Sequence, residues 1–101
     1  MTKTFDEIVK EHNDFQVSQL QRQLETAFYW MAKATQESRE GNFRSATSSM
    51  MLATKSFIDA QHQSDLYLSD EDDIDYANIV ELALAQARID MYKESKDNNE
   101  D

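Results

Sequence analysis

The chain contains no proline and only one glycine, Gly41, among its 101 residues. These two residue types most often end helices, so their scarcity leaves few places where a helix has to stop. Helix formers such as Ala, Leu, Glu, Gln, Met and Lys are common, and no strand-like alternation of apolar and polar residues extends over a useful length. The sequence therefore predicts one all-α domain, which is all that a chain of this length has room for.

Two segments carry apolar residues at alternating steps of three and four, which place them on one face of a helix. In residues 15–40 these are Val17, Leu20, Leu24, Ala27, Met31 and Ala34. In residues 43–63 they are Phe43, Ala46, Met50, Ala53, Phe57 and Ala60. Gly41 lies between the segments and can adopt the left-handed conformation that ends many helices. We therefore expect an antiparallel αα-hairpin that turns at Gly41.

Residues 74–92 carry two apolar stripes, displaced from each other by more than a third of a turn. The first contains Ala77, Val80, Leu84, Ala87 and Met91. The second contains Leu82, Ala85, Ile89 and Tyr92. A helix at the edge of a small domain usually shows one apolar face. Two faces predict two sets of neighbours, either within the fold or in another chain.

The ends of the helices are predicted from capping patterns. Thr4 followed by Glu7 has the spacing of a capping box and predicts the start of a short N-terminal helix. Nothing at residues 12–14 forbids its continuation, but we expect a kink or short turn there, with Asp14 as the next cap. Ser69 followed by acids predicts that the last helix runs from about residue 70 to Lys93. The expected fold is a small antiparallel helical bundle of three long helices plus the short one. It occupies residues 1–93, and a mobile acidic tail follows at residues 94–101.

The charge is uneven along the chain. Residues 1–68 carry nine acids and seven bases, whereas residues 69–101 carry eleven acids and three bases, which gives the net charge of −10. Such a field repels nucleic acid and anionic membranes and attracts basic proteins. We therefore expect a protein partner with a basic surface, and no direct contact with nucleic acid or a membrane. The expected acidic surface comprises Asp70, Glu71, Asp72, Asp73 and Asp75.

The location of the protein is predicted from three negative features. The chain has no cysteine, no apolar stretch of about 18 residues and no signal-peptide layout at its N-terminus. We expect a soluble, cytoplasmic protein.

The sequence predicts no enzyme, metal site or cofactor. Asp59 and His62 have a spacing compatible with a shared ion, but neither His62 nor His12 is preceded by the glutamate that di-iron bundles use. An EF-hand loop starting at Asp70 would need glycine where Asp75 stands. The serines lie in no nucleophile-elbow context, and a single glycine cannot form a phosphate loop.

Part of the hairpin carries large and small packing residues at defined spacings, namely Trp30, Ala34, Gly41, Phe43, Ala46, Met50 and Ala53. At these positions it resembles a tetratricopeptide repeat. Glu37 stands where the repeat has an aromatic residue and Ile58 where it has proline, and no second copy follows one period later. The same residues suit any tightly packed αα-hairpin, so we assign the resemblance to hairpin packing.

The second stripe of the last helix is the predicted contact surface, together with aromatic residues that face away from the hairpin. The expected partner-binding residues are Leu82, Ala85, Ile89, Tyr92, Tyr29 and Trp30. A contiguous apolar patch marks a contact surface, unless residues 5–15 fold across the stripe and cover it. We expect a non-enzymatic adaptor or regulator that docks a partner through this face, and a homodimer through the same face is a further option.

The alternative is a phage-type inhibitor whose carboxylates mimic the phosphates of DNA and occupy a nucleic-acid-binding protein or nuclease. The small size and the acidic C-terminal third fit this class, although the acids do not form a regular double row. The two hypotheses differ in salt dependence, because mimicry depends on screened charges.

Overall fold

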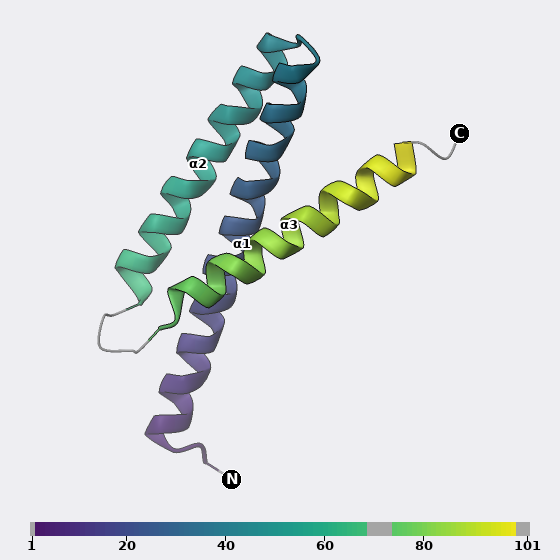
Figure 1. Cartoon of the computed structure of the whole chain (residues 1–101). Coiled ribbons are helices and arrows are strands. Elements are labelled where there is room, and N and C mark those ends of the chain that lie inside the picture. Colours follow the sequence, from purple (N-terminus) through teal and green to yellow (C-terminus); the bar gives the residue numbers. More distant parts are fainter. Residues whose placement is uncertain (1, 69–73, 99–101) are drawn as a thin grey trace.

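The computed structural model describes residues 2–68 and 74–98, and these residues form three α-helices and no strand. The helices are α1 (Phe5–Arg39), α2 (Phe43–Tyr67) and α3 (Tyr76–Asn98). In Figure 1, α1 and α2 lie side by side and antiparallel, and α3 crosses α1 obliquely. The predicted all-helical class is confirmed.

α1 is one continuous helix of 35 residues, so the predicted break at residues 12–14 and the separate short N-terminal helix are wrong. Asn13 and Asp14 are only moderately unfavourable in a helix, and neither glycine nor proline is present to interrupt the backbone ladder. Thr4 is the N-cap, as predicted, because its side-chain oxygen accepts a hydrogen bond from the Glu7 amide at 3.2 Å.

The connection between α1 and α2 is short. Gly41 has a φ of 82°, a conformation that costs glycine little and other residues more. Asn42 then caps α2 by accepting a hydrogen bond from the Ser45 amide at 3.4 Å. Hydrogen bonds between polar side chains link α1 and α2 at two points along the hairpin. The Ser49 hydroxyl donates to the Glu37 carboxylate at 2.5 Å, and the Gln63 side-chain amide donates to the Gln16 side-chain oxygen.

The later helix ends differ from those predicted. α2 continues four residues past Gln63 to Tyr67, and Leu68 after it is buried. α3 begins at Tyr76, since Ile74 and Asp75 are not helical, and the Asp75 side chain accepts a hydrogen bond from the Asn78 amide at 3.1 Å. The predicted cap Ser69 lies outside the described residues. α3 also continues past Lys93 to Asn98, so the part of the predicted tail at residues 94–98 is helical.

The core is thin. Its main cluster joins all three helices near the start of α3 through Leu20, Ala60, Leu68 and Ile79. Six of the nine buried apolar residues are alanines, so most of the packing brings backbones close together without enclosing large side chains. Such a core buries little apolar area per residue.

The helices form an open arrangement. α2 and α3 each pack along α1, but they contact each other far less. The radius of gyration is 16.9 Å, compared with about 13 Å for a compact domain of this length. The first turns of α1 extend beyond the end of the hairpin (Figure 1). Large parts of the helix surfaces are therefore left without neighbours among residues 2–68 and 74–98.

Candidate docking surface

The inner face of α3 is the face that packs on α1. Its buried residues are Ile79, Ala83 and Ala87, and Ala83 is completely covered. Val80 and Ala77, which belong to the first predicted stripe, are exposed. Ile79 and Ala83 belong to neither predicted stripe, because the oblique crossing of α3 over α1 selects a narrow strip that the sequence periodicity does not specify. Ala83 is small enough to let the two backbones approach closely at this crossing.

The second predicted stripe lies on the opposite side of α3. We call Leu82, Ala85, Ile89 and Tyr92 the outer face of α3. Leu82 and Ile89 are each 47 % exposed, Tyr92 is 68 % exposed, and Ala85 is also exposed. Two aliphatic side chains and an aromatic ring therefore form a continuous apolar stripe about three turns long.

Residues 5–15 do not fold across this stripe. They form the first turns of α1, and Phe5 and Phe15 are themselves exposed. Of the two alternatives left open by the sequence, intramolecular cover by the N-terminal segment is not what the structure shows.

Tyr29 and Trp30 have a different environment from the outer face of α3. Both are half-buried on α1, with their rings edge to face at 5.3 Å between centroids. The Lys33 ammonium lies 5.7 Å from the Tyr29 ring centroid and 5.6 Å from that of Trp30. This geometry is typical of cation–π contacts. The two aromatic residues thus form a cluster with Lys33 at the junction of α1 and α3.

Glu94 of α3 completes this cluster, a role that its polar surroundings in the sequence did not indicate. The Tyr29 hydroxyl donates a hydrogen bond to the Glu94 carboxylate, and the Lys33 ammonium donates another to the same group at 3.2 Å. The hydrogen bond from Tyr29 holds the pKa of Glu94 below its ordinary value of 4.5, and Lys33 adds to this although partial burial opposes it. The Glu94 contact raises the pKa of both Tyr29 and Lys33. The cluster fastens the C-terminal half of α3 to α1.

The predicted acidic surface is only partly described. Asp75 is exposed and caps the first turn of α3, so one of its oxygens is engaged with the helix. Asp70, Glu71, Asp72 and Asp73 lie outside the described residues.

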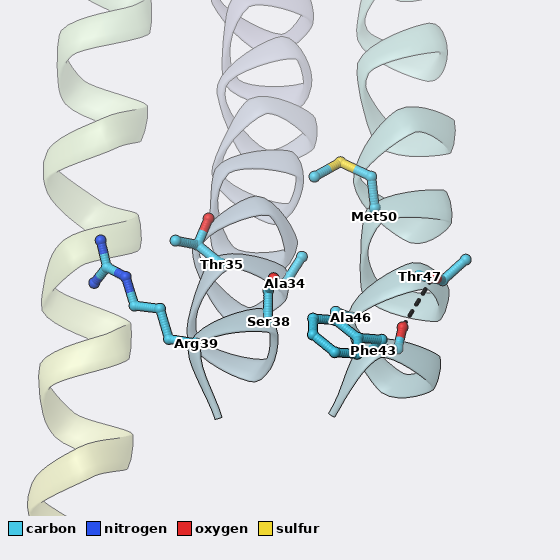
Figure 2. Close-up of a pocket in the computed structure, with 8 residues that line it drawn as sticks. All are labelled: Ala34, Thr35, Ser38, Arg39, Phe43, Ala46, Thr47 and Met50. Atoms are coloured by element: carbon cyan, nitrogen blue, oxygen red, sulfur yellow. Dashed lines mark hydrogen bonds between the residues drawn. The ribbon is translucent and has the colours of Figure 1, made fainter. Parts of the chain in front are cut away.

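A shallow hollow lies between α1 and α2 at the end of the hairpin near Gly41 (Figure 2). Phe43 and Met50 of α2 point toward α1, and Arg39 of α1 points toward α3. The eight lining residues are Ala34, Thr35, Ser38, Arg39, Phe43, Ala46, Thr47 and Met50. Their side chains offer an apolar floor, hydroxyls and one guanidinium, which suits contact with another molecule better than acid–base chemistry.

Within residues 2–68 and 74–98, no three His, Cys, Asp or Glu side chains are grouped so that they could hold a metal ion. In the same part of the chain, no helix combines the length and the apolar character needed to span a membrane.

Comparisons of the chain with protein-family models, with curated proteins and with solved structures gave no match.

Proposed function

We propose that this chain is a protein-binding module, an adaptor or regulator that docks a partner through the outer face of α3. The observation that carries the proposal is the exposure of Leu82, Ile89 and Tyr92 on a helix whose other side is already packed. Exposed single apolar residues are ordinary, but an aligned stripe of them is typical of helices that dock on another protein.

Aromatic and aliphatic side chains near the centre of such a stripe supply most of the binding free energy in protein interfaces. Tyr92 offers a large rigid ring with a polar end, and Ile89 and Leu82 offer aliphatic surface on the same face. Ala85 between them leaves a shallow space into which a side chain of the partner can fit.

The net charge of −10 supports a partner with a basic surface around its apolar contact area. Complementary charge at the edge of an interface raises the association rate more than the final affinity. We therefore assign binding strength to the outer face of α3 and partner selection to the surrounding acids.

The experiment is affinity capture from the native host with three versions of the full chain: wild type, Ile89→Asp and Ile58→Asp. Ile58 lies on α2 and is 48 % exposed, which matches the exposure of Ile89, so it is a control for adding a charge elsewhere. We expect the partner to be retained by wild type and Ile58→Asp and lost by Ile89→Asp. Titration with the isolated partner should show about 30-fold weaker binding for Ile89→Asp, as for a central interface residue.

Equal capture by all three versions would contradict the proposal. Salt dependence then tests charge mimicry of DNA. Affinity that depends on mimicked phosphates would fall by about 10³-fold or more between about 50 and 200 mM salt, whereas apolar docking should change far less.

A further inference from the structure

A second unpartnered apolar surface lies at the other end of the molecule, on the first three turns of α1. We call residues 5–15 the N-terminal projection. Phe5 is 79 % exposed, Phe15 59 %, Ile8 53 % and Val9 37 %. The projection extends past the end of the hairpin in Figure 1. The described polar contacts of its side chains, the Lys3–Glu11 ion pair at 2.7 Å and the Thr4 cap, are local to this end of the chain.

The residues of the projection are poor candidates for a free helical extension. Asp6, Ile8, Val9, Asn13 and Asp14 all have lower helix propensity than Ala, Leu or Lys. A helix of such residues needs packing on its apolar face to be stable in water. Residues 2–68 and 74–98 supply no such packing for Phe5, Ile8 and Phe15, which are all exposed.

We infer that the N-terminal projection pairs with the same segment of a second copy of the chain, in an antiparallel contact with two-fold symmetry. This inference does not depend on the proposed function, because it uses a different surface. The face of the projection that meets the second copy contains Phe5, Ile8, His12 and Phe15, with steps of three, four and three. These steps read the same in both directions, so antiparallel pairing places Phe5 opposite Phe15 of the second copy and Ile8 opposite His12 of the second copy.

The residues beside this face also fit self-pairing. Val9 lies on one flank near the symmetry axis and adds apolar contact with Val9 of the second copy. Glu11 lies on the other flank, and its charge is already compensated by Lys3. Two like charges would therefore not meet uncompensated at the centre of the interface.

The outer face of α3 is less suited to self-pairing, although its stripe has the same three steps. Arg88 lies on the flank of that stripe near its midpoint, and it is exposed. Antiparallel pairing there would bring two Arg88 side chains together, which opposes association. This difference assigns self-association to α1 and leaves the outer face of α3 for another protein.

The exposed area of the chain allows self-pairing through the N-terminal projection as well as docking through the outer face of α3. The chain exposes 7701 Å², whereas a compact monomer of 11.8 kDa is expected to expose about 5,900 Å². The difference, about 1,800 Å², is roughly twice the area of about 800 Å² that a standard interface takes from each partner. Leu66 at the end of α2 is 73 % exposed, and the Gln63–Gln16 contact holds the last turns of α2 beside this part of α1.

The test is the mass of the full chain in solution, measured by sedimentation equilibrium from about 1 to 200 μM, a range that covers typical dimer affinities. We expect the wild type to reach twice 11.8 kDa. Ile8→Asp should remain at the monomer mass at the highest concentration, and its helical circular dichroism should fall by no more than the share of residues 5–15, which lose the packing that stabilises them. Ile89→Asp should form the dimer like the wild type, which separates this inference from the proposed function.

Cross-linking tests the direction of pairing, and the chain is suited to it because it has no cysteine of its own. A mixture of Phe5→Cys and Phe15→Cys chains should oxidise to a disulfide-linked pair of the two variants. Efficient linkage of Phe5→Cys to itself would overturn the antiparallel arrangement. A monomeric wild type at 200 μM, or a dimer broken by Ile89→Asp and kept by Ile8→Asp, would overturn the inference.

Discussion

At the scale of single residues, the attachment of α3 depends most visibly on Glu94. Its carboxylate accepts hydrogen bonds from Tyr29 and Lys33, which lie one helical turn apart on α1. The residue was assigned to the mobile tail by its polar sequence context, because no local pattern indicates a partner more than 60 positions away.

The Glu94 cluster makes the attachment of α3 sensitive to pH. The folded pKa of Glu94 lies below 4.5, so its stabilising contribution is complete above that value and is lost as the pH falls through the folded pKa. The raised pKa values of Tyr29 and Lys33 give the opposite sign: their contributions are complete below 10.0 and 10.5 and are lost as the pH rises through the folded values. We expect the last turns of α3 to be held best between these limits.

The measurement is a ¹³C NMR titration of the Glu94 carboxyl group in the wild type and in Tyr29→Phe. The midpoint should lie below 4.5 in the wild type and move upward in the variant, which lacks the donor that lowers the pKa most. Identical midpoints in the two proteins would show that the hydrogen bond from Tyr29 does not hold this carboxylate.

At the scale of the helices, periodicity predicted the helical class and the αα-hairpin well. The apolar steps in residues 43–63 located the start of α2 at Phe43, and the Thr4 cap located the start of α1. The continuity of α1 was not predictable from Asn13 and Asp14, since both residues occur at caps and inside helices. The start of α3 at Tyr76 was missed because the acids before it also suit the first turn of a helix.

The buried side of α3 shows a second limit of periodicity. A repeat of three and four residues specifies a stripe, but the angle at which two helices cross decides which residues of that stripe are covered. Here the crossing buries Ile79 and Ala83, which belong to neither predicted stripe, together with Ala87, and it leaves Val80 of the first stripe exposed. The outer face, in contrast, follows the predicted residues, since nothing in the described chain packs against it.

The closeness of the α1–α3 crossing gives a prediction for Ala83. Ala83→Leu should destabilise the fold by about 1–3 kcal/mol, because a larger side chain at this completely covered position forces the helices apart. The matched control is Ala85→Leu, two residues along α3 on the outer face, which should change stability by less than about 0.5 kcal/mol. Urea unfolding followed by circular dichroism measures both. Equal stability of the two variants would show that α3 does not pack on α1 through Ala83.

At the scale of the whole molecule, the three helices are arranged around α1 without closing into a compact bundle. The extents are 56 × 28 × 20 Å, and the long dimension follows α1. An alanine-rich core and an open shape leave apolar surface at both ends of the chain. We assign one such surface, the N-terminal projection, to a second copy and the other, the outer face of α3, to a different protein.

The most direct test of this account is the accessibility of individual methyl groups to a soluble paramagnetic probe, measured by NMR on the free full-length chain. We predict strong broadening of the Leu82 and Ile89 methyl signals, which belong to the outer face of α3, and little broadening of Ile79 on the inner face. Protection of Leu82 and Ile89 equal to that of Ile79 in the free chain would contradict the existence of an open docking surface.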